Sequence, residues 1–169
     1  GPASSSIQVN AIAIFNDQIY AATEAGLFVA DITNPNLIDA TNWNLLFTGN
    51  YTNVVVFDGG VYSSKGNELL EIKGTTLAVK KTFPGSIFTL KSSSQFLTVA
   101  LKKSAIVLNT SLSEIVQSTA TTTYNYTLHT AFSTENSLFL GTKEYGILKA
   151  SFSDVQNFSE IHPKGPLSN

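Results

Sequence analysis

Few residues in this chain could carry out acid–base or metal chemistry. The sequence has two histidines, His129 and His162, and no cysteine. Neither histidine has an acidic partner at the spacing that metal ligands usually show. No glycine-rich phosphate loop, metalloprotease helix or nucleophile elbow occurs in the sequence. The sequence therefore predicts no metal site, no cofactor and no catalytic histidine.

Two carboxylates deserve a separate test, because glycoside cleavage needs a pair of acids that face one cleft. Glu24 and Glu144 occupy similar turn positions near the two ends of the chain. Carboxylates in turns are usually solvated, so we predict that the chain is not an enzyme. A polysaccharide-degrading enzyme remains the alternative that this pair would support.

The basic residues offer a different kind of chemistry. All ten are lysines, and four of them fall in equivalent expected turns, at Lys65, Lys102, Lys103 and Lys143. If those turns share one face of the fold, the lysines form a shallow binding site for an anionic glycan or an acidic protein surface, and binding weakens with salt. Tyr62 and Tyr145 add aromatic groups for stacking, as do Tyr124 and Tyr126. The alternative is a set of solvated turns without a ligand.

The elements that position these residues are repeated. The stretch IYAATEAGLFVA at 19–30 resembles LFLGTKEYGILKA at 138–150, and weaker copies begin at Val61 and Phe96. The copies follow one another at about 40 residues, the spacing of β-propeller blades with four strands each. We therefore predict an all-β propeller fragment over residues 7–169. Its blades are expected at about 7–50, 51–86, 87–123 and 124–165, with 166–169 as the link to a further blade.

The pattern within each copy supports this fold. β-Branched and aromatic runs alternate with Asn, Asp, Gly and Ser turns, and no window shows a sustained helical period. Gly26, Gly66 and Gly146 are expected to relax the turn between the second and third strands. The third copy has Lys102, Lys103 and Ser104 in this place, so its turn should differ. A β-sandwich is the alternative, but sandwich strands have no reason to recur in groups of four.

Composition narrows the class of protein further. Hydrophobic residues make up 43% of the chain and charged residues 13%, with a net charge of −2. Nucleic-acid binding is not expected, because such proteins carry a basic excess. No apolar run reaches the roughly 20 residues that span a bilayer, so membrane insertion is not expected. Because the chain has no methionine and starts with Gly1-Pro2, we expect a piece of a longer protein, with residues 1–6 as a tag scar and disordered lead.

These repeats resemble a known family. LFLGTKEYGILKA is similar to the two-component-regulator propeller repeat of Bacteroidetes proteins, and the first copy resembles the N-terminal propeller of PorZ-like proteins of the type IX secretion system. The resemblance covers about Ile7 to Asn169, and it is weaker in the two middle copies. It implies a non-enzymatic part, about half of one propeller of the seven-bladed type. The family's second propeller and C-terminal signal have no counterpart in this chain.

The resemblance also implies a place and partners. PorZ-like proteins lie on the outer-membrane surface with the sortase PorU and help to couple secreted cargo to an anionic lipopolysaccharide. We therefore expect a scaffold at the extracellular face of the outer membrane, or in the periplasm. The alternative is the glycan-sensing periplasmic propeller of a hybrid histidine kinase. The open ends of such a propeller fragment could also drive self-association. No ligand-contacting residue of the family matches a motif in this sequence.

Overall fold

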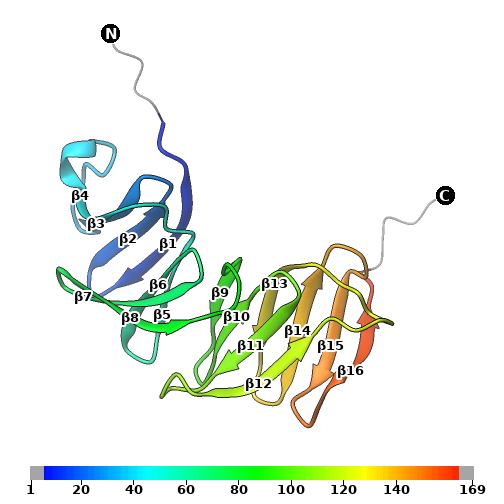
Figure 1. Cartoon of the computed structure of the whole chain (residues 1–169). Coiled ribbons are helices and arrows are strands. Elements are labelled where there is room, and N and C mark those ends of the chain that lie inside the picture. The colour runs from blue at the N-terminus through cyan, green and yellow to red at the C-terminus, as the bar shows by residue number, and fades with distance from the viewer. Residues whose placement is uncertain (1–5, 164–169) are drawn as a thin grey trace.

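The computed structural model describes residues 6–163, which form four antiparallel sheets of four strands each (Figure 1). The first sheet contains β1 (Val9–Phe15), β2 (Gln18–Thr23), β3 (Gly26–Asp31) and β4 (Asn44–Thr48). The second contains β5 (Asn53–Phe57), β6 (Gly60–Lys65), β7 (Glu68–Lys73) and β8 (Thr76–Thr82). Strands follow one another in sequence order within each sheet, so each sheet is a simple meander.

The other two sheets repeat this topology. The third contains β9 (Thr89–Ser92), β10 (Leu97–Ala100), β11 (Ser104–Leu108) and β12 (Glu114–Thr119). The fourth contains β13 (Leu128–Ser133), β14 (Ser137–Thr142), β15 (Ile147–Ser151) and β16 (Asp154–Ile161). Between residues 6 and 163 the only helical element is the 3-10 turn η1 (Ala40–Asn42), which lies in the long connection from β3 to β4. Over the same range, no helix is long and apolar enough to cross a membrane.

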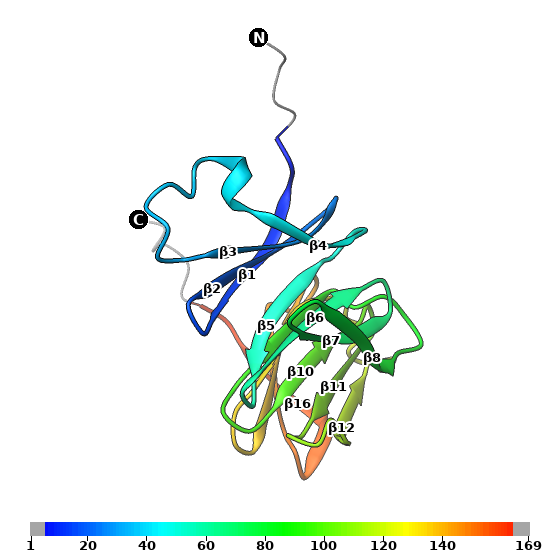
Figure 2. The same cartoon turned by 90° about the vertical axis from the view of Figure 1, so that its left-hand side faces the viewer.

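The four sheets follow one another in an arc, with the first and the fourth at its two ends (Figure 1). The first strand of each sheet contacts the first strand of the next: β1 lies against β5, β5 against β9, and β9 against β13. Figure 2 shows β5 beside β1 from the side. Successive sheets that pack face to face in this way are propeller blades. The predicted all-β propeller architecture is confirmed, and two facing sheets of a sandwich are not what the chain forms.

The hydrophobic core is divided among the junctions between blades. One cluster fills the first junction and includes Leu27, Val54 and Leu70. A second cluster lies between the second and third sheets, and a third between the third and fourth. Burial of each such leucine or valine stabilises the fold by roughly 1.5–3 kcal/mol, so the junctions provide most of the stability.

Hydrogen bonds between buried polar groups also join neighbouring blades. Asn53 on β5 accepts a hydrogen bond from the amide of Leu90 (3.2 Å) and donates one to the carbonyl of Phe88 (3.2 Å). The hydroxyls of Thr98 and Ser133 hydrogen-bond to each other between the third and fourth sheets. Because an unpaired buried polar group is costly, these bonds favour one alignment of neighbouring blades.

The pairing of β10 corrects the register of the third repeat. The sequence analysis began this copy at Phe96, but Leu97 pairs with Leu108 and packs toward the second sheet. Leu97 therefore corresponds to Val61 of the second blade. A shift of one residue moves every side chain of a strand to the other face of its sheet. The Thr and Gly that align the outer copies are missing from the third, so the sequence held no marker for its register.

Two expectations lie at the ends of the chain. Of the proposed lead at 1–6, residues 1–5 lie outside the described residues, as does the whole proposed link at 166–169.

Candidate functional site: the lysine edge

The turns that carry the four predicted lysines lie at one edge of the blade array. We call this the lysine edge; it comprises the turns between the second and third strands and the linkers that enter each new blade. Backbone hydrogen bonds hold each linker against the turn of the preceding blade. Their donors and acceptors are Tyr51 N to Thr23 O, Ile87 N to Gly66 O, and Leu128 N to Lys102 O, each 2.9 Å long. Successive turns and linkers therefore form one continuous edge.

The repeated threonine organises the turns of the two outer blades. In the first blade, the hydroxyl of Thr23 accepts the amide of Gly26 (3.0 Å) and donates to the carbonyl of the same residue (2.7 Å). In the fourth, the hydroxyl of Thr142 accepts the amide of Tyr145 and donates to the carbonyl of Gly146, both at 2.9 Å. The repeated Thr therefore builds the turn, and the recurrence of these letters has a structural cause.

The glycines of these turns have two different roles. Gly66 and Gly146 adopt positive φ angles of 58° and 68°, as the sequence analysis expected. Gly26 does not, and it opens β3 in extended conformation. A Cβ at Gly26 would lie 2.4 Å from Cδ1 of Leu45 and 2.7 Å from the carbonyl oxygen of Phe47. Gly26 is therefore needed for close packing of β4, not for a left-handed turn.

All four predicted lysines are exposed at the lysine edge. Lys65 extends over the ring of Tyr51, with Nζ 5.7 Å from the ring centroid. Lys103 donates to Oδ1 of Asn125 at 2.9 Å, so its ammonium group lies on the linker into the fourth blade. No described contact within residues 6–163 holds the ammonium groups of Lys102 and Lys143. The edge thus presents cations from the second, third and fourth blades.

The candidate catalytic glutamates belong to the same edge, but they do not form a pair. Glu24 lies in the first blade and Glu144 in the fourth, at opposite ends of the arc. Each holds the linker of its own blade: Glu24 Oε1 accepts the amide of Gln8 (3.3 Å), and Glu144 Oε2 accepts the amide of Thr127 (2.6 Å). The bond from Thr127 lowers the pKa of Glu144. The two carboxylates therefore share a structural role and do not face a common cleft.

Tyr145 belongs to an aromatic group at the fourth blade. Its ring makes an edge-to-face contact with Tyr124, with centroids 5.2 Å apart, and Tyr124 makes another with Phe158 at 5.4 Å. The hydroxyl of Tyr145 reaches the carbonyl of Thr123 (3.4 Å). Partial removal from water raises the pKa of Tyr124, and the neighbouring Glu160 carboxylate raises it further. Tyr126 lies beneath this group, fully buried against Phe158.

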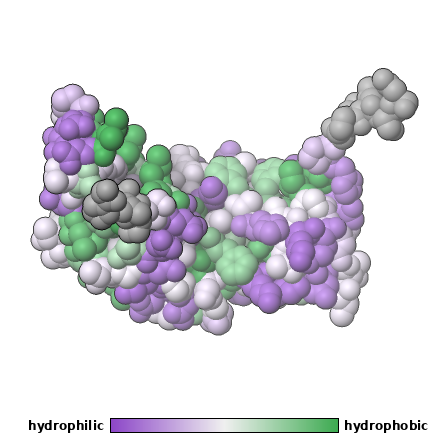
Figure 3. All heavy atoms as spheres, turned by 90° about the horizontal axis from the view of Figure 1, so that it is seen from above, coloured by the Kyte–Doolittle hydropathy of each residue, from purple (hydrophilic) through white to green (hydrophobic). Residues whose placement is uncertain are grey.

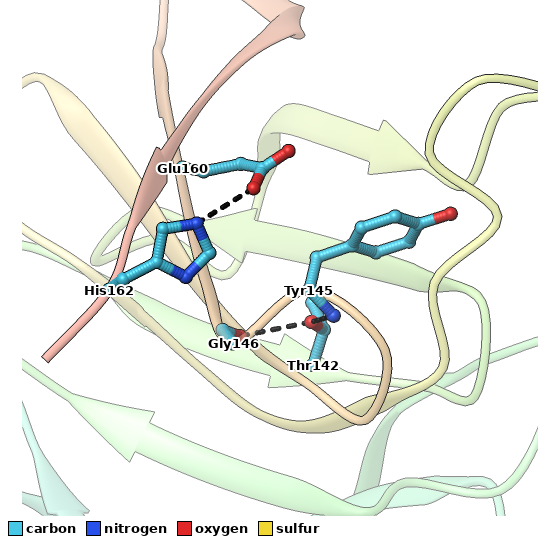
Figure 4. Close-up of polar contacts among 5 residues, drawn as sticks. All are labelled: Thr142, Tyr145, Gly146, Glu160 and His162. Carbon is cyan, nitrogen blue, oxygen red and sulfur yellow. Dashed lines mark hydrogen bonds and ion pairs between the residues drawn. The ribbon is translucent and has the colours of Figure 1, made fainter. Parts of the chain in front are cut away.

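A histidine–carboxylate contact that the sequence analysis missed lies beside this group (Figure 4). His162 Nε2 is 2.8 Å from Oε2 of Glu160. The pair lies at the end of β16, next to the turn at Gly146, where a Cβ would approach His162 Nδ1 to 3.7 Å. The signal was available, since residues two apart on a strand share a face. Within residues 6–163, no three His, Asp or Glu residues are grouped to hold a metal ion.

Two sequence-derived candidates lie elsewhere. Tyr62 was expected near the lysines, but it lies within β6, buried, with its ring edge-to-face against Phe57 at 6.2 Å. It lines a cleft of about 450 Å³ at the opposite edge, between the first and second blades. Glu71 lines the same cleft and is paired with Lys73 (2.9 Å), whose hydrogen bond lowers the pKa of Glu71. His129 lies exposed on β13.

Fold and edge together define a propeller-type β protein of four blades with a mixed lysine, tyrosine and glutamate edge. No protein-family profile matches the chain, and no curated protein matches it either. Solved propellers do match. PorZ, an essential bacterial surface component of the type IX secretion system of Porphyromonas gingivalis, aligns over 99% of this chain and 23% of its own, with 14% identity and a TM-score of 0.70.

Two further structures are similar. The extracellular domain assigned to a hybrid two-component system of B. thetaiotaomicron aligns over 94% of this chain and 25% of its own, with 16% identity and a TM-score of 0.67. The WD40 propeller domain of Doa1 aligns over 90% of this chain and 54% of its own, with 13% identity and a TM-score of 0.68. The chain thus spans about a quarter of the first two proteins. At these identities, the likeness establishes the propeller fold.

Proposed function

We propose that this chain is a non-enzymatic binding module that holds an anionic partner on its lysine edge. The observation that carries the proposal is the placement of Lys65, Lys102, Lys103 and Lys143 on one continuous edge of three successive blades. Hydrogen-bonded turns fix the backbone of these lysines, and their exposed ammonium groups attract phosphate or carboxylate groups. Glu24, Glu68 and Glu144 offset part of the charge, so binding should depend on local geometry as well as on net charge.

The finer assignment is a PorZ-like scaffold at the cell surface, within the type IX secretion system. The propeller likeness to PorZ and the repeat resemblance support it. On this assignment the anionic partner is a lipopolysaccharide, and a PorU-like sortase is the protein partner. The chain would then work outside the inner membrane as part of a larger propeller of the seven-bladed type.

A second candidate is favoured by one observation, the edge-to-face pair of Tyr124 and Tyr145. Figure 4 shows Tyr145 of this pair beside Glu160 and His162. Aromatic rings flanked by hydrogen-bonding groups suit the stacking of a sugar ring. This arrangement supports a glycan-sensing propeller, as in a two-component system. Such a site does not require lysines, so the two candidates differ in what lysine substitution does.

The test uses two matched triple variants. Lys65→Ala/Lys102→Ala/Lys143→Ala removes exposed lysines from the edge, and Lys80→Ala/Lys91→Ala/Lys149→Ala removes exposed lysines elsewhere. Binding of purified anionic lipopolysaccharide is measured by biolayer interferometry at low and high salt. The edge variant should lose about tenfold in affinity, because each exposed ion pair is worth roughly 0.2–1 kcal/mol. Affinity of the unmodified chain should fall as salt rises.

Equal loss in both variants would count against the lysine edge. Salt-independent binding of a neutral glycan that is abolished by Tyr145→Ala would favour the sensor instead. The scaffold assignment is tested separately, by co-purification with a PorU-like sortase at low and high salt. Recovery that is equal for the unmodified chain and the edge variant would remove the edge from that interaction.

A further inference from the structure

The first sheet has two apolar faces, and one of them lies against no blade of the array. One face packs on the second sheet through Ala22 and Leu27. The opposite face carries Val9, Ile12 and Ile14, whose side chains are 55%, 61% and 54% exposed. Figure 3 shows hydrophobic side chains at the surface of this end of the array. An exposed apolar sheet face of this kind usually marks an interaction surface.

The repeat shows what this face is built to contact. Residues of β2 and β3 on the open face occupy the same repeat positions as residues of β14 and β15 that are buried between the third and fourth blades. The equivalent pairs are Ile19 and Leu138, Ala21 and Leu140, Phe28 and Leu148, and Ala30 and Ala150. The open face is therefore a blade junction without its second half. Terminal repeats that end an array carry polar outer faces instead.

The open face is also hollowed. Ala21 stands where the fourth blade has the larger Leu140, and an apolar pocket of about 200 Å³ is lined by Val9, Ala21, Phe28 and Trp43. The indole nitrogen of Trp43 donates to the carbonyl of Leu37 (3.0 Å), so the connection from β3 to β4 fixes one wall. The face can accept a bulky apolar side chain.

The other end of the array presents such side chains. The outer face of the fourth sheet carries the cross-strand pair Phe132 and Phe139, together with Ile147 and Ile161. Phe132 is 41% exposed and Ile161 is 38% exposed. Lys149 covers part of the face, with Nζ 5.6 Å from the ring centroid of Phe139. This face corresponds to the side of the first, second and third sheets that packs on the next blade.

We propose that a second copy of this chain docks the outer face of its fourth sheet on the open face of the first sheet. This contact continues the series of three junctions within the chain, each of which joins the same two sides of successive blades. A head-to-tail contact forms a ring if its rotation closes. Two copies of four blades close through two such junctions into a ring at the upper end of the usual propeller range of about 4–8 blades.

The test is the mass of the chain in solution, measured by size-exclusion chromatography with light scattering over a range of concentrations. The expected mass is twice that of one chain. Ile12→Lys/Ile14→Lys should reduce it to one chain, and so should Phe132→Lys/Ile161→Lys on the opposite face. The control Val79→Lys/Ile115→Lys changes two exposed apolar residues on the outer strands β8 and β12 and should keep the double mass. Circular dichroism verifies that every variant remains folded.

Mixing the two interface variants makes the test specific for head-to-tail docking. Each variant keeps the interface face that is altered in the other, so one junction can still form between them. The mixture should therefore regain the double mass, but at higher concentration, because one junction is intact instead of two. A single-chain mass for the unmodified protein at every concentration overturns the proposal and leaves the face to a further blade, as the larger propeller of the PorZ-like assignment requires. An open-ended series of masses, or dissociation of the control variant, also overturns it.

Discussion

The carboxylate of Glu144 accepts the backbone amide of Thr127 at 2.6 Å and so ties the turn of the fourth blade to the linker that enters that blade. Glu24 makes the same contact with Gln8 in the first blade. A glutamate one or two residues after the turn threonine thus ties the turn to the linker in both outer blades, although its position in a turn resembles that of a catalytic acid.

This contact predicts a pH dependence. The hydrogen bond from Thr127 lowers the pKa of Glu144 below its usual value of 4.5, so the ionised form is favoured in the folded state. Its stabilising effect is fully present above pH 4.5 and is lost as pH falls through the lowered pKa. Between pH 6 and pH 3, the melting temperature of Glu144→Gln should fall less than that of the unmodified chain. Glu135→Gln, in an exposed turn, should follow the unmodified chain.

The turn threonines predict a loss of stability on removal of one hydroxyl. Thr142→Val keeps the shape but leaves the amide of Tyr145 without its partner and removes one of the two hydrogen bonds to the carbonyl of Gly146, which still accepts the backbone amide of residue 142. The free energy of unfolding should drop by about 1–3 kcal/mol. Urea denaturation measures this drop, and Thr142→Ser, which keeps the hydroxyl, should recover most of it. Equal destabilisation by valine and serine would show that the methyl group, not the hydrogen bonds, matters.

The two glycine roles predict opposite responses to asparagine. Gly146→Ala forces a Cβ into a left-handed conformation at a cost of roughly 1–2 kcal/mol, and Gly146→Asn should cost less, because asparagine tolerates this region. At Gly26 either substitution places a Cβ against Leu45 and the Phe47 carbonyl, so asparagine should be at least as harmful as alanine. Thermal unfolding of the four variants tests this. Rescue of Gly26 by asparagine would contradict the close-packing role.

A buried hydroxyl predicts a stabilising substitution. The ring of Tyr126 is fully buried, and its hydroxyl lies near Ser118 but makes no hydrogen bond of good geometry with any residue that the structure describes. Burial also raises the pKa of this phenol. Tyr126→Phe removes the unpaired group and should stabilise by about 1 kcal/mol. The melting temperature should then rise by about 2–4 °C for a chain of this size. Tyr126→Leu, which also removes ring volume, should lower it. A lower melting temperature for the phenylalanine variant would indicate a hidden partner.

Sequence reasoning reached the fold because Thr142 and Gly146 mark a turn that Thr23 and Gly26 repeat. Sequence reasoning was wrong where the local residues do not determine strand register or the position of a side chain along a strand. The third copy lacks both markers, so the register of Leu97 was misplaced by one residue. Tyr62 lies three residues before Lys65 on β6, which at about 3.3 Å per residue separates them by ~10 Å. The course of β6 reveals this separation, whereas the contact between Glu160 and His162 could have been inferred from their spacing of two residues.

The linkers that enter each blade are bonded to the turn of the preceding blade as well as to their own. The unit that recurs is therefore a sheet together with the linker hydrogen bonds that join it to the preceding blade. A duplication of about 40 codons that begins anywhere in the repeat adds both the sheet and its linker. The new blade is then hydrogen-bonded to its neighbour through that linker.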